Sequence, residues 1–401
     1  MCFRMITVQQ WSDPGGAEAA GVVDTPFPPG EFAARITAVR QAMVERELDL
    51  LLVSSPENLV YLTGLDHWGY FAPHLLILPL AGEAVLITRA MERVTVTTQV
   101  RHARFAGHPD HETVADVAYR ELGGRPLGRV GFEPVSSGLP MALGQALQAQ
   151  LTARAFVDAS GLIDAIRMVK SPAEQACLRA AAKVSDAAAS AAIQAARAGA
   201  SEAEIAAASL AAMALHGTYP GFGPFIRATS RLGEEHTSWS QQRLRAGDTL
   251  FLELSGCVAR YHAPLGRLLH IGQAPPEAHA MAAVAKEAFA AVVASLKDGV
   301  LARDVYAAWQ GVVDRAGLGH YRRHHCGYLV GIGVPPSWTG GNQVWGLRPD
   351  SDLPIRTGMS FHVLSWLMGT GQGDFFISDT VLLGDQGAEV LTHTPTDVTI
   401  R

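Results

Sequence analysis

The chain has 401 residues, of which 48% are hydrophobic and 17% are charged, and its formal net charge is -6. This length exceeds what one ordinary hydrophobic core supports, so we expect two domains. The sequence lacks the basic surface that nucleic acid requires, and no apolar run approaches the roughly 18 residues of a membrane helix, so we expect neither partner. The cysteines (Cys2, Cys177, Cys257 and Cys326) are too widely separated for a zinc site or a disulfide framework, which favours reduced thiols in the cytoplasm.

Residues 1–30 are rich in Gly, Pro, Ala and Asp and are predicted to form a loosely ordered arm. From residue 31 to residue 165, helical periodicity alternates with short apolar runs, which predicts a compact α/β domain. The expected elements are strands over 50–53 and 129–132, a hairpin over 74–88, and helices over about 32–48, 112–122 and 138–152.

The second predicted domain, residues 166–401, begins with a helix start signal. Ser171 and Glu174 form a capping box with Pro172 at the first helical position, and Ser201 and Glu204 repeat the capping pattern. Further helices are expected near 277–296 and 302–316, and strands over 249–252, 359–364 and 375–383. Two helix pairs and an antiparallel sheet predict an α+β layer structure.

A polar stretch in the second domain is the predicted active site. Glu253 follows an apolar strand, where an unpaired charge is costly to bury. After residues 255–256, the chain is expected to return past Glu253 with Arg260, His262 and Arg267. A carboxylate, an imidazole and two guanidinium groups on neighbouring strands can bind and protonate a small polar substrate.

Four short segments resemble the pita-bread superfamily, which includes methionine aminopeptidase, prolidase and creatinase. They are the inter-domain segment 166–174, the turn 247–248 before the acidic strand end, the loop 327–331 and the segment 357–361. The resemblance spans about residues 31–395. It implies an α/β N-terminal creatinase-like domain followed by an α+β pita-bread C-terminal catalytic domain.

The metallopeptidases of this superfamily bind two metal ions through two Asp, one His and two Glu. Carried onto this chain, the five positions hold Glu253, Pro264, Tyr328, Leu364 and Ser378. Divalent metals need anionic oxygen or imidazole ligands, and one acid among five positions does not hold a dinuclear centre. We therefore predict no metal, no other cofactor and no metallopeptidase activity.

Further segments are similar to ectoine hydrolases, which are metal-free members of the superfamily. They are 62–68, 236–239, 253–265, 334–338, 347–349 and 358–362. The resemblance implies a metal-independent hydrolase of a C–N bond in a small cyclic amidine or amide, acting as a homodimer. It also implies that the N-terminal domain of one subunit leans over the active site of the other, so that Trp68 and Tyr70 act in trans.

Three residues are the candidate catalytic groups. Glu253 is expected to serve as nucleophile or general base, His236 as proton shuttle, and His262 in proton transfer or ligand binding. The forked guanidinium group of an arginine matches a substrate carboxylate, although an ion pair within the protein is the alternative. Tryptophans offer π contacts to a substrate, although packing in the core is the alternative. The candidate substrate-binding residues are Tyr328, Asp379, His362, Arg260, Arg267, Arg348, Trp68, Tyr70, Trp239 and Trp338.

One departure from ectoine hydrolases leaves alternatives open. The last strand of ectoine hydrolases carries two acids. Phe376 occupies the position of the first acid, and Asp379 can take the place of the second. The lost carboxylate favours a divergent enzyme that acts on another small amidine, guanidino or amide substrate by hydrolytic or non-hydrolytic chemistry. A catalytically inactive homologue that binds a ligand or a partner is the other alternative.

Overall fold

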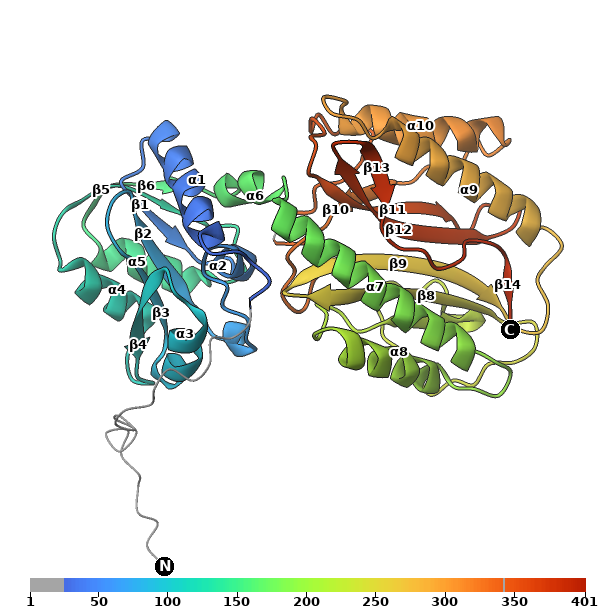
Figure 1. The fold of residues 1–401 in the computed structure, drawn as a ribbon, viewed down its shortest axis with the longest axis horizontal. Helices are drawn as coiled ribbons and strands as arrows, with labels where there is room; N and C mark the ends of the chain where they lie inside the picture. Colours follow the sequence, from blue (N-terminus) through green and yellow to red (C-terminus); the bar gives the residue numbers. More distant parts are fainter. Residues whose placement is uncertain (1–24, 342) are drawn as a thin grey trace, which may run out of the picture.

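The computed structural model describes residues 25–341 and 343–401, which form two domains (Figure 1). The loosely ordered arm predicted for residues 1–30 therefore lies mostly outside the described residues. The chain passes between the domains through α6 (Leu162–Arg167), and the predicted boundary after residue 165 falls inside this helix. An α/β domain followed by an α+β domain confirms the predicted fold class.

The N-terminal domain is a mixed sheet with helices on both faces. Its strand order is β4-β3-β2-β1-β5-β6, formed by β1 (Leu50–Val53), β2 (Leu75–Pro79), β3 (Ala84–Arg89), β4 (Ala103–His108), β5 (Leu127–Phe132) and β6 (Ala153–Asp158). The helices are α1 (Glu31–Glu45), α2 (Pro56–Thr63), α3 (Arg93–Gln99), α4 (Val114–Leu122) and α5 (Met141–Gln150). Leu51 packs with α1 and α2, whereas Leu52 packs with α4 and α5, so β1 is buried on both faces. The apolar pattern predicts the β2–β3 hairpin but not β4 and β6, whose residues are mostly half-buried or exposed.

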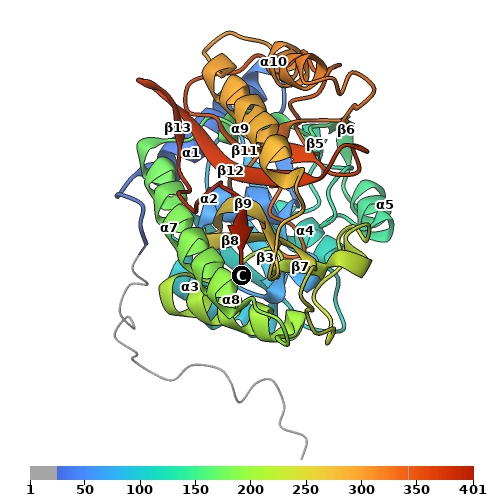
Figure 2. The same cartoon turned by 90° about the vertical axis from the view of Figure 1, so that its right-hand side faces the viewer.

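The C-terminal domain is a larger sheet with α7 to α10 on one face (Figures 1 and 2). The strand order is β10-β11-β12-β9-β8-β7, with β13 beside β12 and β14 beside β9. The strands are β7 (Phe225–Ala228), β8 (Thr249–Val258), β9 (Tyr261–His270), β10 (Gly327–Leu329), β11 (Ser360–Leu367), β12 (Phe375–Gly384), β13 (Gly387–Val390) and β14 (Thr399–Ile400). The helices are α7 (Pro172–Ala195), α8 (Glu202–His216), α9 (Ala278–Ser295) and α10 (Ala302–Arg315). Both predicted capping boxes are present, at the starts of α7 and α8.

The helix α9 corrects one expectation from the sequence. It is 18 residues long and is apolar enough, by length and composition alone, to cross a membrane. In the structure, Met281, Ala285 and Val292 of α9 are buried in the core beside β11 and β12. This one-sided packing is typical of a core helix.

The β8–β9 hairpin turns later than the sequence predicts. The turn lies at Ala259 and Arg260, whose φ angles of 49° and 67° are left-handed, as a two-residue hairpin turn requires. Consequently Glu253 lies in the middle of β8 and pairs with Gly266, whereas His262 pairs with Cys257 near the turn. This register decides which of the predicted polar side chains meet Glu253.

Alternation along the strands separates the two faces of this sheet. Leu252 and Ile377 face the helices, and Phe251 and Phe376 face the other way. On the helix-free face, the apolar and aromatic side chains form a cluster of Phe225, Phe251, Leu268, Trp338, Leu364, Trp366 and Phe376. The candidate site opens beside this cluster.

Candidate active site

A cavity of about 440 Å³ opens on the helix-free face of the C-terminal sheet. Glu253 of β8, Arg227 of β7 and Tyr328 of β10 contribute from the sheet itself. The loop residues His236 and Trp338 complete the walls. The cavity therefore gathers side chains from strands and loops that are more than 100 residues apart in sequence.

The strand register places several key positions in one row across the sheet. Glu253 pairs with Gly266, Gly266 with Ser378, and Ser378 with Leu364. A side chain at Gly266 would collide with Phe376, because an added Cβ would lie 2.3 Å from its ring. Glycine at this position thus lets the Phe376 ring pack over β9 beside Glu253.

The carboxyl group of Glu253 is the unpaired acid of the cavity. Its side chain is 12% exposed, and among the described residues no group donates a hydrogen bond to it. Burial raises the pKa of Glu253 to about 8, because the charged form loses hydration; Arg227 counteracts this effect and Glu235 adds to it. Glu253 is therefore largely protonated at neutral pH, and a modest change in its surroundings will ionise it.

A neutral hydrogen-bonded network lies behind Glu253. The Nδ1 atom of His362 is 2.8 Å from the Tyr328 hydroxyl, which also accepts a hydrogen bond of 3.0 Å from Trp338 Nε1. The other ring nitrogen, Nε2, is 2.7 Å from Ser378 Oγ and 4.0 Å from the Glu253 carboxyl. Burial lowers the pKa of His362 well below its usual value and raises that of Tyr328, so both groups are neutral.

His236 lines the cavity from an exposed loop, as predicted for a proton shuttle. Its backbone is left-handed, with a φ of 54°, and its ring centroid lies 6.2 Å from that of Phe225. The placement gives the imidazole access to both the cavity and solvent. Its role as the shuttle stays a prediction.

The structure corrects the expectation for His262. Its side chain is fully buried and does not line the cavity. Its Nε2 atom accepts a hydrogen bond of 2.7 Å from the Gly221 backbone N–H, and Nδ1 lies 2.9 Å from the Arg260 carbonyl oxygen. Burial lowers the pKa of His262 to about 3. A neutral imidazole with both nitrogens bonded to backbone stabilises the fold and does not transfer protons at the cavity.

Arg267 and Asp379 are also corrected, because they face the helices. Arg267 Nη2 donates to Asp379 Oδ1 at 2.8 Å, and both side chains are almost fully buried. Arg267 further donates to backbone carbonyl oxygens, including those of Ser378 and Pro395. Arg267 follows Gly266 and Asp379 follows Ser378, both of which lie in the row across the sheet that includes Glu253. Successive side chains of a strand point to opposite faces, so Arg267 and Asp379 point away from the cavity. The pair is therefore structural.

Arg260 and Trp239 lie away from the cavity, and Trp68 and Tyr70, which were predicted to act on the partner's site, do not line the cavity of their own chain. Arg260 forms an ion pair of 2.5 Å with Asp66. Trp68 is mostly exposed and packs against Tyr219, and the Tyr70 hydroxyl donates to the Leu65 carbonyl oxygen at 2.9 Å. Trp239 packs beside Gly223 and does not line the cavity. In contrast, Tyr328, Trp338 and Arg348 line it as predicted, and His362 contacts Tyr328 directly.

Sequence reasoning missed the cavity residues Arg227, Glu235, His324 and His325. Arg227 gave a signal of the same kind as Glu253, namely a charged residue within a short apolar strand. Glu235 and the two histidines lie in polar loop sequence, where a cavity residue and a surface residue have the same pattern. These three could be found only from the fold.

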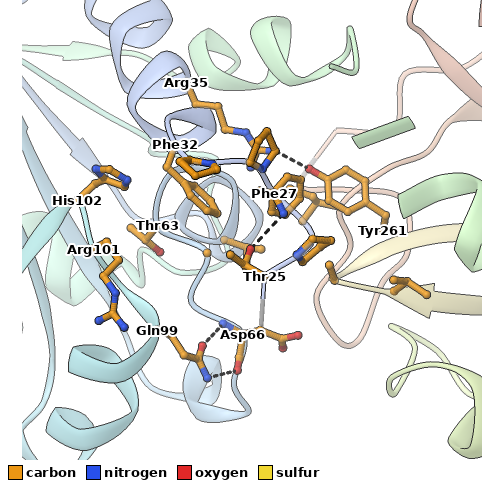
Figure 3. A pocket seen from close by; sticks show the side chains of 18 of the residues that line it. Thr25, Phe27, Phe32, Arg35, Thr63, Asp66, Gln99, Arg101, His102 and Tyr261 are labelled. Atoms are coloured by element: carbon orange, nitrogen blue, oxygen red, sulfur yellow. Dashed lines mark hydrogen bonds between the residues drawn. The ribbon is translucent and has the colours of Figure 1, made fainter. Parts of the chain in front are cut away.

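A second and larger cavity, of about 730 Å³, lies at the junction of the two domains (Figure 3). Its polar groups largely satisfy one another: Arg35 pairs with Glu31, and the Gln99 side chain bonds the Asp66 backbone. Tyr261 at its edge donates to Glu174 at 2.8 Å. In the cavity of Glu253, by contrast, the Glu253 carboxyl and two nitrogens of the Arg227 guanidinium have no hydrogen-bond partner among the described residues, so that cavity is the candidate active site.

Residues 176–385, which include Glu253 and the strands around it, match metallopeptidase family M24. The chain belongs to metallopeptidase family M24. Residues 35–169 of this M24 protein match the creatinase/prolidase N-terminal domain. At the level of the family, the protein is a hydrolase.

Relatives of this M24 protein cover nearly its whole length. The ectoine hydrolase of Halomonas elongata is 26% identical over 401 residues, covering 94% of this chain and 99% of that protein. The Xaa-Pro dipeptidase of Pyrococcus horikoshii is 24% identical, covering 90% and 97%. The structure of an Xaa-Pro dipeptidase from Bacillus anthracis matches with a TM-score of 0.80 and 22% identity, over 92% of this chain and 100% of that one. These findings confirm the pita-bread resemblance and the similarity to ectoine hydrolase.

The cavity of this M24 protein does not fit the two metal ions of the metallopeptidases. Of the five corresponding positions, Glu253 is the one acid, and Pro264 and Leu364 have no donor atom. The remaining two are hydroxyl groups that bond His362, from Tyr328 and Ser378. In the part of the chain that the structure describes, no group of three His, Cys, Asp or Glu side chains is arranged to hold a metal ion.

Proposed function

We propose that this protein is a metal-independent hydrolase that opens the ring of a small cyclic amidine by cleaving a C–N bond. The observation that carries the proposal is the Glu253 carboxyl, which is buried at a cavity without a hydrogen-bond donor among the described residues, although the other four metal-binding positions hold no acid or histidine. A similar relative along the whole chain is named an ectoine hydrolase, which supports an amidine ring as the substrate class.

Glu253 supplies the chemistry in one of two ways. As a nucleophile, its carboxylate bonds to the planar amidine carbon, the C–N bond breaks as the ring nitrogen takes a proton, and water then hydrolyses the enzyme-bound intermediate. As a general base, Glu253 takes a proton from a water molecule while the water oxygen bonds to the same carbon. In both cases the water oxygen ends on the former amidine carbon, and the ring nitrogen leaves as an amine.

His236 is the proposed proton shuttle. The leaving ring nitrogen needs a proton, and the His236 imidazole lies at the cavity on a solvent-exposed loop. Exchange with solvent can restore the proton after each turnover. Tyr328 and His362 are hydrogen-bonded to each other beside Glu253, and this bond fixes their orientation. Because the pKa of His362 is lowered, its imidazole does not take the proton of Glu253.

The proposed assembly is a cytoplasmic homodimer in which the N-terminal domain reaches the neighbouring active site. Support comes from Trp68 and Phe71, whose side chains remain 58% and 80% exposed, although Trp68 also packs against Tyr219 of the C-terminal domain. Burial in a partner would remove this apolar surface from water. The described cysteines, Cys177, Cys257 and Cys326, are free thiols, as a reducing compartment favours.

A second candidate function is hydrolysis or another reaction of a different small amidine, guanidino or amide substrate. Phe376 favours it, because this ring stacks on Phe251 with centroids 5.0 Å apart where ectoine hydrolases carry an acid. The sheet surface beside the cavity is therefore apolar at this position, although neither ring lines the cavity itself. A protein without activity, which binds a ligand or partner, is the third outcome that the experiment below separates.

The test is product formation by purified, EDTA-treated protein with ectoine, hydroxyectoine or creatine, followed by mass spectrometry. Ring opening of ectoine that survives EDTA and disappears in Glu253→Gln supports the proposal. The matched control is Glu389→Gln, which changes an exposed acid paired with Arg179. Turnover of creatine alone favours the second candidate, and an unaltered Glu253→Gln activity refutes both enzymatic roles of Glu253.

A further inference from the structure

The guanidinium group of Arg227 lies buried at the cavity without the hydrogen bonds it requires. Its side chain is 2% exposed, and Nε and Nη1 have no hydrogen-bond partner among the described residues. Its Cζ atom lies 4.4 Å from the centroid of the Phe251 ring, which supports one face of the fork. A buried guanidinium with free N–H groups is energetically costly, so this group is poised for an acceptor.

The ion-pair partner of Arg227 among the described residues is Glu235, in the loop before His236. Glu235 Oε2 lies 3.8 Å from Arg227 Nη1, which is beyond hydrogen-bond distance. The Glu235 side chain is 59% exposed, so water competes for its carboxylate. Glu235 therefore compensates the charge of Arg227 from the cavity side without satisfying its N–H groups.

The other arginines proposed from the sequence do not offer a free fork. Arg267 donates to Asp379 and to several carbonyl oxygens, and Arg260 pairs with Asp66. Arg348 lines the cavity, but its half-exposed side chain pairs with Asp350 at 3.1 Å. Of the described arginines that line the cavity, Arg227 is thus the one whose unmet hydrogen bonds and burial together indicate a ligand.

The strand register also sets the spacing between Arg227 and Glu253. Phe225 pairs directly with Glu253, and Arg227 lies two residues further along β7 on the same face. Such diagonal neighbours on antiparallel strands are about 7–8 Å apart. A small ring that carries one carboxylate can reach both side chains at this separation.

We propose that Arg227 binds the carboxylate of the substrate and that Glu235 occupies its place until the substrate displaces it. The substrate class is then a small cyclic amidine with a carboxylate substituent. The fork of Arg227 binds the carboxylate through two N–H groups, and the amidine carbon lies toward Glu253. This inference deepens the proposed function and rests on it for the amidine part alone.

The test compares ligands that differ only in charge, by isothermal titration calorimetry at neutral pH. Wild-type protein is expected to bind ectoine about 10- to 100-fold more tightly than ectoine carboxamide, because a charge-assisted fork is lost with the amide. Arg227→Met is expected to bind the two ligands equally. Glu235→Gln is expected to bind ectoine more tightly than wild type, because the competing carboxylate is gone.

Two controls separate binding from folding. Arg315→Met removes an exposed arginine paired with Glu287 far from the cavity, and it is expected to keep the wild-type preference. Thermal unfolding of Arg227→Met reports whether the variant folds; Arg227→Lys, which keeps the charge but not the fork, provides a second variant. In turnover, both Arg227 variants are expected to raise KM more than they lower kcat.

The outcomes distinguish this inference from the proposed reaction. If ectoine is not hydrolysed but its binding depends on Arg227 and on the ligand carboxylate, the carboxylate site stands and the reaction falls. If ectoine is hydrolysed and Arg227→Met keeps the wild-type KM and ligand preference, the reaction stands and the carboxylate site is overturned. Absence of saturable binding of ectoine, hydroxyectoine and creatine to wild-type protein overturns the carboxylate site as well.

Discussion

The Nε2 atom of His362 lies 4.0 Å from the nearest carboxyl oxygen of Glu253. The imidazole is already bonded to Tyr328 and Ser378 and is kept neutral by burial, so it brings no positive charge to Glu253. Burial therefore raises the pKa of Glu253 to about 8 without a counteracting charge from His362. The reactivity of the cavity at neutral pH therefore depends on how readily this one carboxyl ionises.

The pH dependence of kcat/KM is the first prediction. A nucleophile or general base must be ionised, so kcat/KM is expected to rise with pH and to reach half its plateau near pH 8. The measurement is kcat/KM between pH 6 and pH 10 at substrate concentrations far below KM, with unfolding monitored at each pH. A profile that falls above pH 8 would instead assign Glu253 as a general acid.

Glu253→Gln is expected to abolish turnover and to stabilise the fold at alkaline pH. The folded protein keeps the Glu253 proton up to about pH 8, whereas an ordinary glutamate releases it near 4.5. Wild-type stability therefore falls as pH rises through this window, and the glutamine variant avoids a penalty on the order of a few kcal/mol. Chemical unfolding of both proteins at pH 5 and pH 8.5 measures their free energies of unfolding. If the two proteins differ by the same free energy at both pH values, ionisation of Glu253 does not explain the effect.

Asp379→Asn is expected to lower stability, because it leaves Arg267 charged and buried without its partner. Breaking a buried ion pair costs about 3–5 kcal/mol, and Asp379 also accepts a hydrogen bond of 2.6 Å from Thr392. The folded fraction is expected to keep the wild-type KM, since the pair faces away from the cavity. A raised KM at unchanged stability would restore Asp379 to the substrate site.

Glu253 lines a cavity, but not all of the neighbours predicted for it lie there, and the hairpin turn explains the difference. Ala259 and Arg260 form the turn with left-handed backbones, although residues of these types rarely mark such a turn. Moving the turn changes every pair along β8 and β9, so His262 and Arg260 lie at the end of the hairpin instead of beside Glu253. Local sequence did not contain this information.

Alternation explains a second group of differences. Arg267 was predicted in the site as a fork for a substrate carboxylate, and Asp379 as the counterpart of an acid in ectoine hydrolases. They follow Gly266 and Ser378 of the row that includes Glu253, and successive strand residues point to opposite faces. Capping boxes and apolar runs, by contrast, are local, and they predicted the starts of α7 and α8 and most of the strands. Arg227 could have been found as a charged residue in an apolar strand, whereas Glu235 required the folded loop.

Tyr328→Phe tests whether the network behind Glu253 positions the cavity. The Tyr328 hydroxyl accepts from Trp338 Nε1 and bonds His362 Nδ1, so its removal leaves two polar atoms without a partner. We expect a loss of about 1–3 kcal/mol in stability, a shift in Trp338 fluorescence and a fall in kcat.

The matched control is Tyr321→Phe, whose hydroxyl donates to the Met368 carbonyl oxygen at 3.0 Å but does not line the cavity. It is expected to lose similar stability while keeping kcat. If both variants lose stability and neither loses kcat, the bonds of Tyr328 serve the fold alone. If Tyr328→Phe raises KM and leaves kcat unchanged, its hydroxyl contacts the substrate in addition to holding His362. A fall in kcat confined to Tyr328→Phe would show that the orientation of His362 beside Glu253 matters for the reaction.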